Sequence, residues 1–276
     1  MAPIPPPTDG RHHVNSLLMR ESLLDKTVMS STDTPVVRML PNCHVVKVGA
    51  HSILDGGRAT TYPLVDAIGK ALGRHKLILG TGGGVRTRHV FSIGIDLGLP
   101  TGVLAQLAAA DALGNAHMLG SLLAPYGVVA IPPEIFGHLL PLFLHSAPGV
   151  VFSGVPPYSL WEHPPGVGRI PPHRTDTGSY LVSEVLGTRS MIYVKDVDGL
   201  YTADPKKDKG ARFIPRITVA ELKELDLADV VVERAVFDFM ANAQARRSIQ
   251  VINGLVPGNL TRALEGEPVG TIITAD

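Results

Sequence analysis

The sequence predicts an α/β fold, a three-layer α/β/α sandwich with a mainly parallel central sheet. Along most of the chain, short apolar runs of strand length alternate with longer segments whose apolar residues recur at helical spacing. Several of these runs lack polar alternation, which is typical of strands covered on both faces. Hydrophobic residues make up 45% of the 276 residues and charged residues 18%, a composition that suits a compact, well-buried chain.

The first elements follow a proline-rich start. Residues 1–39 open with "MAPIPPPTDGRHH" and are expected to form a peripheral arm with a helical piece near 14–24, while residues 40–276 form one domain. "CHVVKVGA" (43–50) predicts a strand that enters a glycine turn. "TYPLVDAIGKALGRH" carries apolar residues at four-residue spacing, which predicts a helix with one buried face.

The middle of the chain continues this alternation. "KLILG" (76–80) predicts a buried strand that ends in a glycine cluster, a long helix is expected over 103–123, and "VVAIP" and "GVVFSG" predict two further strands. Prolines interrupt the apolar tract 128–155, so it does not predict a membrane span. The proline-dense tract 156–174 is expected to be an irregular loop, long enough to suggest a function.

The last third again alternates helices and strands. We expect a helix over 177–186, a strand in "SMIYVKDVDG", helices near Ala220 and Val236, a strand in "IQVIN", a short helix from Asn259, and a final strand in "VGTIITA". Strands separated by helices in this way favour a parallel-rich sheet with helices on both faces.

The charge balance and cysteine content exclude some functional classes. Lys+Arg and Asp+Glu number 25 each, so no excess of positive charge indicates a nucleic-acid or anionic-membrane partner. The single cysteine, Cys43, cannot form an internal disulfide, which is consistent with a reducing cytoplasm. No charged segment followed by an apolar one opens the chain, so a cytoplasmic protein is expected.

The glycine cluster in "KLILGTGGGVRTRH" (76–89) suggests an anion site. It fits neither the dinucleotide-binding fingerprint nor the P-loop pattern. A strand that ends in consecutive glycines nevertheless exposes backbone N–H groups to an anion, and the arginines that follow carry guanidinium groups suited to oxyanions. A lysine stands before glycine at an earlier strand end. The residues concerned are Lys47, Gly49, Gly82, Gly83, Gly84, Arg86 and Arg88. An ordinary turn with solvated arginines is the alternative.

A second stretch strengthens the anion interpretation. "VKDVDGLYTADPK" (194–206) supplies a lysine, several acids and an exposed tyrosine in one strand-end loop. Asp198–Gly199 is a turn dipeptide, Tyr201 is suited to flank a purine, and Asp196 is suited to a metal. These residues, Lys47 and Asp176 all lie at predicted strand ends, where open α/β sheets bind ligands. The alternative is an ordinary hairpin-like turn.

These motifs, in order, resemble the amino-acid-kinase superfamily and are similar to UMP kinases over residues 43–276. The resemblance rests on Lys47 with Gly49, "GTGGGVRTR", "RTDTG", "KDVDGLYTADPK" and "NLTRALEGEPVGTIIT". It implies that the lysine and glycine turns hold phosphates, that Asp176 organises the reacting groups, and that the 198–206 loop holds base and ribose. The implied catalytic residues are Lys47, Asp176 and Lys195, and the implied nucleotide contacts are Lys47, Gly49, Gly82, Gly83, Gly84, Arg86, Asp198, Gly199, Tyr201, Asp204, Pro205 and Lys206.

Within that superfamily the chain is similar to the molybdenum storage subunits. "VVFSGVPPYSLW", "IPPHRTDTG" and "VINGLVPGNLTRALEGEPVGTIITA" carry this narrower resemblance. It implies a hetero-hexameric cage of two homologous subunits that binds ATP and Mg²⁺. In such a cage ATP hydrolysis drives molybdate (or tungstate) inward, where it condenses into polyoxomolybdate clusters. The chain is then an ATP-hydrolysing store rather than a metabolic kinase.

The cargo and the metal require their own ligands. Oxyanion clusters are held by histidines, amides, arginines and lysines, while Mg²⁺ prefers carboxylates. The candidate metal and cluster contacts are Asp196, Glu134, His138, His163 and His173. Two alternatives stay open at this point: a UMP kinase-type phosphotransferase, and a nucleotide-binding regulatory subunit without catalysis.

Overall fold

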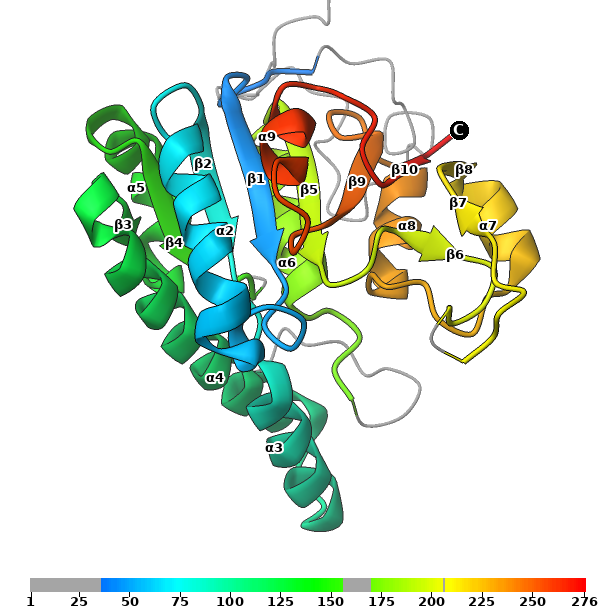
Figure 1. Ribbon diagram of the computed structural model, residues 1–276. Helices are drawn as coiled ribbons and strands as arrows, with labels where there is room; N and C mark the ends of the chain where they lie inside the picture. Colours follow the sequence, from blue (N-terminus) through cyan, green and yellow to red (C-terminus); the bar gives the residue numbers. More distant parts are fainter. Residues whose placement is uncertain (1–35, 156–169, 206) are drawn as a thin grey trace, which may run out of the picture. The chain divides into compact units, whose positions relative to one another are not determined.

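The computed structural model describes residues 36–155, 170–205 and 207–276, without the side chains of 133–138. Residues Val37–Asp276 form one compact unit built around a central sheet (Figure 1). The strands are β1 (Cys43–Val48), β2 (Lys76–Gly80), β3 (Val129–Ala130), β4 (Gly149–Phe152), β5 (Ser190–Lys195), β6 (Leu200–Tyr201), β7 (Phe213–Ile214), β8 (Arg216–Thr218), β9 (Ser248–Asn253) and β10 (Thr271–Thr274).

The helices alternate with these strands along the chain. They are η1 (Leu54–Gly56), α2 (Arg58–Ala71), α3 (Gly84–Asp96), α4 (Thr101–Leu123), η2 (Ala124–Tyr126), α5 (Pro133–Ser146), α6 (Thr175–Val185), α7 (Val219–Leu225), α8 (Arg234–Ala241) and α9 (Asn259–Leu264). None of these described helices combines the length and apolar character needed to cross a bilayer.

Eight strands form the central sheet in the order β3-β4-β2-β1-β5-β9-β10-β8. Neighbouring strands pair parallel throughout, except that β10 runs antiparallel to β9. β6 and β7 form a separate antiparallel pair. The predicted mainly parallel α/β sheet is therefore confirmed.

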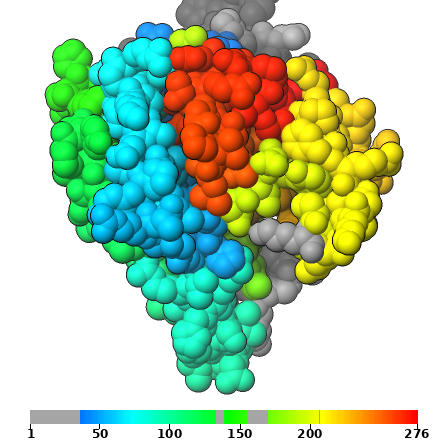
Figure 2. Space-filling view, in the orientation of Figure 1, coloured from blue at the N-terminus to red at the C-terminus, as the bar shows by residue number. Residues whose placement is uncertain are grey.

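Helices cover both faces of the sheet, and alternate strand residues enter two separate cores. In β1, Val46 packs with residues of α2, α4 and α9, whereas Val45 packs with residues of α5, α6 and α8. In Figure 2, α2 and α9 lie side by side over the first of these faces. Burying one such aliphatic side chain fully contributes about 1.5–3 kcal/mol, so the two cores make up much of the fold's stability.

Most expected elements are present near their predicted positions. The helices expected over 103–123 and 177–186 are α4 and α6. The sequence did not predict α3, which begins at Gly84, the last residue of the glycine cluster, and buries only Phe91 and Gly94. A helix with so few buried positions carries little apolar periodicity. The expected helix at 14–24 and most of the proline-dense loop lie outside the described residues.

The order of the strands brings the residues of the site together. β2 pairs with one side of β1, and β5, which comes later in the chain, pairs with the other side. Since the three strands are parallel, their carboxyl ends meet at one edge, where open α/β sheets bind ligands. Lys47 pairs with Gly80 and with Tyr193 in this register, so residues of all three strands converge there.

Candidate functional site

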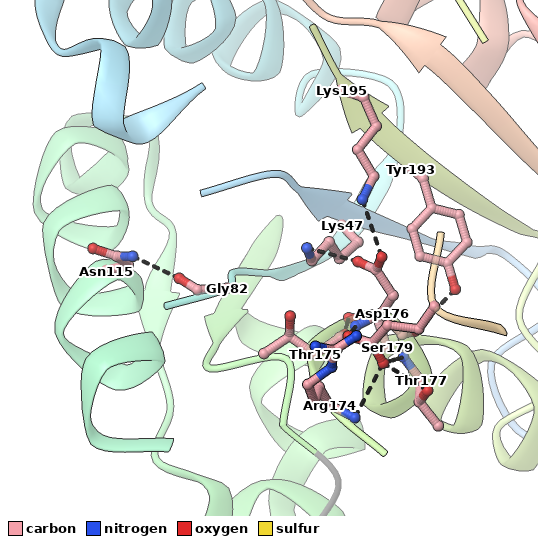
Figure 3. A network of polar contacts seen from close by, with 11 residues as sticks. Lys47, Gly82, Asn115, Arg174, Thr175, Asp176, Thr177, Ser179, Tyr193 and Lys195 are labelled. Carbon is pink, nitrogen blue, oxygen red and sulfur yellow. Dashed lines mark hydrogen bonds and ion pairs between the residues drawn. The ribbon is translucent and has the colours of Figure 1, made fainter. Parts of the chain in front are cut away.

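Three charged residues meet at the carboxyl ends of β1 and β5, and we call them the lysine–aspartate centre: Lys47, Asp176 and Lys195. Asp176 lies in the first turn of α6, between the two strand-end lysines (Figure 3). Lys47 Nζ lies 2.6 Å from Asp176 Oδ1, and Lys195 Nζ lies 3.0 Å from Asp176 Oδ2. The structure thus brings the three predicted catalytic residues together, while their roles stay a prediction.

The centre is almost completely removed from water. Lys47 and Asp176 are each 5% exposed. Burial raises the pKa of the Asp176 carboxyl, but the charges and hydrogen bonds of Lys195 and Lys47 outweigh burial, so its pKa lies below the ordinary value. Burial lowers the pKa of Lys195, and Asp176 opposes that shift. Two ammonium groups flank one carboxylate, which suits the centre to an incoming anion.

The backbone N–H and carbonyl groups of Asp176 also form hydrogen bonds with side chains. Tyr193 on β5 donates its hydroxyl to the Asp176 carbonyl oxygen at 2.9 Å. Glu233, which precedes α8, accepts from the backbone N–H of Asp176 at 3.2 Å. Neither residue was predicted from the sequence. Tyr193 lies within an apolar run, so the sequence indicates only a buried strand residue. Glu233 precedes a helix, and an acidic residue in that place ordinarily predicts a cap on the helix that follows it, not on another helix.

Gly82 provides open space beside the lysine–aspartate centre. A Cβ placed on Gly82 would lie 3.4 Å from Lys47 Nζ and 3.1 Å from Thr175 Oγ1. Because glycine has no Cβ, this space stays open beside the ammonium group. Space of this kind beside an ammonium group is suited to an oxyanion such as phosphate, and the phosphate contact stays a prediction.

The glycine turn is held in place from α4. Asn115 Nδ2 donates to the Gly82 carbonyl oxygen at 2.5 Å, and Arg86 donates a guanidinium N–H to Asn115 Oδ1 (Figure 3 shows the first contact). Arg86 therefore supports the turn through Asn115. Its predicted contact with a nucleotide stays a prediction.

The other end of the turn is tied to the loop after β1. Gly84 has a φ of +70°, which favours glycine, and Val85 N–H donates to Asp55 Oδ2 at 2.8 Å. A Cβ on Gly84 would lie 2.6 Å from the same oxygen. The carboxylate of Asp55 thus satisfies a backbone donor at the start of α3 and joins the two glycine-containing turns, the second of which includes Gly49.

The loop after β5 is fixed against β9 and β10. Asp198 Oδ1 accepts from Asn253 Nδ2 at 2.9 Å, and Tyr201 donates to Asp198 Oδ2 at 3.3 Å. Gly199 has a φ of +147°, and a Cβ there would lie 2.3 Å from Thr271 Oγ1. The start of the predicted base-and-ribose loop is therefore held by hydrogen bonds to β9 and β10.

The end of that loop is more exposed. Asp204 forms an ion pair with Lys207 at 3.4 Å, and the side chain of Lys207 is 85% exposed. Pro205 follows Asp204, and Lys206 lies outside the described residues. Their predicted nucleotide contacts stay predictions.

The predicted metal contacts are spread over several elements. Asp196 directly follows β5, and His173 lies just before α6, its ring 5.2 Å from that of Phe239. Burial lowers the pKa of His173, and Glu233 opposes this shift. His163 lies outside the described residues, as do the side chains of Glu134 and His138 in α5. Among the described residues, no three His, Cys, Asp or Glu side chains form a group that could hold a metal ion.

Comparison with known proteins assigns the chain to one protein family. The Amino acid kinase family matches residues 42–253. The chain is 52% identical over 266 residues to Molybdenum storage protein subunit beta of Azotobacter vinelandii, covering 95% of this chain and 97% of that one. It is 31% identical over 236 residues to Uridylate kinase of Metallosphaera sedula, covering 83% and 97%. The solved structure of Uridylate kinase from Archaeoglobus fulgidus matches with a TM-score of 0.66 at 24% identity, covering 84% and 100%.

Proposed function

The chain belongs to the amino acid kinase family and, within it, to the molybdenum storage subunits, and we propose that it stores molybdate (or tungstate) at the expense of ATP. In this proposal the oxyanion condenses into polyoxometalate clusters inside a hetero-hexameric cage, built with a homologous second subunit in the cytoplasm. The observation that carries the proposal is the 52% identity to a molybdenum storage subunit over 95% of the chain.

The lysine–aspartate centre supports the ATP-dependent part of the proposal. Lys47 and Lys195 bind phosphate oxygens, and Gly82 leaves room for them beside Lys47. Asp176 holds the two ammonium groups in place and opposes the lowering of the Lys195 pKa by burial. Asp196, which directly follows Lys195, is the carboxylate we assign to Mg²⁺, because Mg²⁺ in such sites is bound by one or two carboxylates together with phosphate oxygens.

Metal loading tests this proposal directly. The purified protein is incubated with molybdate and MgATP, or with molybdate alone, passed through gel filtration, and analysed for molybdenum. We expect many molybdenum atoms per chain only when ATP is supplied. Background molybdenum in both samples, also after addition of the homologous second subunit, would overturn the storage proposal.

A UMP kinase-type phosphotransferase is the second candidate. It is favoured by the 31% identity to Uridylate kinase and by the complete lysine–aspartate centre, whose charges suit phosphoryl transfer. Formation of UDP from UMP and MgATP would support it. If molybdenum is stored and no UDP is formed, the lysine–aspartate centre catalyses ATP hydrolysis and not phosphoryl transfer to UMP.

A further inference from the structure

Glu233 is buried against a helix to which it does not belong. It immediately precedes α8 but makes no side-chain cap on that helix. Its carboxylate instead lies at the start of α6 and is only 10% exposed. There Oε2 accepts from the backbone N–H groups of Arg174 at 3.0 Å and Thr177 at 3.1 Å, and from Thr177 Oγ1 at 2.7 Å. Oε1 accepts from the Asp176 N–H at 3.2 Å.

These contacts replace a cap that α6 does not supply for itself. Arg174, the residue before α6, makes no side-chain cap bond, and the first N–H groups of a helix have no partner inside it. Glu233 satisfies those of Asp176 and Thr177 with a charged acceptor, and charge-assisted bonds are stronger than neutral ones. The direction of the first turn of α6 therefore depends on a side chain from another part of the chain.

Asp176 is the residue on which these contacts converge. Glu233 holds its N–H, Tyr193 holds its carbonyl oxygen, and Lys47 and Lys195 hold its carboxylate. A shift of the first turn of α6 would move the carboxylate relative to both lysines. Backbone position and side-chain position are thus coupled at this residue.

A strained turn immediately before Glu233 positions this residue at the start of α6. Val231 has a φ of +52°, a conformation that is costly for a β-branched residue. The Val232 N–H donates to the Val230 carbonyl oxygen at 2.6 Å, and Asp229 Oδ1 accepts from the Val231 N–H at 2.9 Å. Val230 and Val232 are each 5% exposed and packed in the core. Strain of this kind persists only where the surrounding structure enforces it, and it is concentrated near functional sites.

We propose that Glu233 is a positioning residue for the lysine–aspartate centre, one that sets the orientation of Asp176 through the first turn of α6. The role in turnover rests on the proposed ATP-dependent function, whereas the structural coupling does not. Glu233 also opposes, through its charge, the lowering of the Lys195 pKa by burial, but less than Asp176 does. The role proposed here is the one that acts through the backbone of Asp176.

The first test measures the coupling without ATP turnover. Hydrogen exchange is followed in the full-length protein and in the variants Glu233→Gln and Asp238→Asn. Asp238 is a matched control, because it is an exposed acid of α8 that pairs with Lys223 at 2.7 Å. We expect Glu233→Gln to accelerate exchange at the amides of 176–177, and Asp238→Asn to leave them unchanged. Unchanged protection in Glu233→Gln would overturn the proposal.

The second test measures ATP turnover per competent binding site. In Glu233→Gln we expect kcat to fall roughly 10- to 100-fold with a much smaller change in KM, since the lysines remain while the carboxylate is misplaced. Glu233→Asp keeps the charge and should recover part of the loss. Equal losses in the Gln and Asp variants, or a normal kcat in Glu233→Gln, would contradict the positioning role.

A milder variant covers the case in which Glu233→Gln does not fold. Thr177→Val removes only the hydroxyl that donates to Glu233 Oε2 and keeps the backbone contacts. It should lower kcat in the same direction by a smaller factor and weaken protection of the same amides. Absence of wild-type ATP turnover would count against the proposed function, whereas the exchange result would still decide the coupling.

Discussion

Lys47 Nζ and Asp176 Oδ1 lie 2.6 Å apart in a region that is almost fully buried. Lys47 lies at the end of a central strand and Asp176 at the start of a helix. Lys195 forms an ion pair with the other carboxylate oxygen of Asp176. A buried carboxylate shared by two ammonium groups is stabilised only as long as all three charges are present.

Lys47→Ala is the first variant to make. Loss of a charged donor should weaken ATP binding about 10- to 100-fold, corresponding to about 1.5–3 kcal/mol. The unfolding free energy should fall by about 3 kcal/mol, because Asp176 keeps only Lys195 as a partner. Isothermal titration with ATP and urea denaturation measure the two effects. An unchanged ATP affinity would show that phosphate does not lie beside Lys47.

Gly84→Ala tests the geometry of the glycine turn. Gly84 has a φ of +70°, and an added Cβ would lie 2.6 Å from Asp55 Oδ2. We expect a loss of about 2 kcal/mol of unfolding free energy in urea, since left-handed backbone costs about 1–2 kcal/mol for other residues and Asp55 must move. Gly73→Ala is the control, because its Cβ would meet only the Lys70 carbonyl oxygen at 3.8 Å. Similar losses in both variants would exclude this account of the turn.

A buried histidine at the opposite end of the sheet predicts a pH dependence of stability. Burial, followed by the charges of His75, Arg189 and Arg246, lowers the pKa of His44 from 6.5 to about 4. Neutral His44 accordingly contributes stability that is fully present above pH 6.5 and is lost as the pH falls toward 4. The loss should reach about 3 kcal/mol, since one pKa unit corresponds to about 1.4 kcal/mol.

Urea unfolding at several pH values checks this expectation in wild type and in His44→Gln. Glutamine keeps a polar partner for Ser190 Oγ, which lies 2.8 Å from His44 Nδ1, but does not titrate. The variant should lose less stability than wild type between pH 6.5 and 4. Parallel pH profiles would mean that His44 is not responsible.

Local sequence patterns predicted the strand-end residues of the site well. Lys47 and Lys195 close apolar runs of strand length, and parallel strands bring such ends to one edge of the sheet. Asp176 was placed with them by the same argument, and the family resemblance then implied its role. Glu233 and Asn115 could not be found in this way, because each contacts a segment far away in the sequence, and no local pattern encodes the packing that brings the two together.

The same limit applies to the glycine turn. The sequence indicates that Gly82 and Gly84 need open space or unusual backbone, and the structure has both features. The sequence does not indicate that Arg86 donates to Asn115, or that Asp55 accepts from a backbone N–H at the start of α3. Polar side chains of this kind have many possible partners, and only the tertiary fold selects one.

Molybdenum loading of wild type and Asp176→Asn, each with MgATP, tests the central claim most directly. Asparagine has nearly the same shape but cannot hold both ammonium groups with a negative charge. We predict that wild type retains many molybdenum atoms per chain through gel filtration, and that the variant, although folded, retains no more than wild type without ATP. Equal loading of the two proteins would contradict the claim that this buried centre couples ATP to storage.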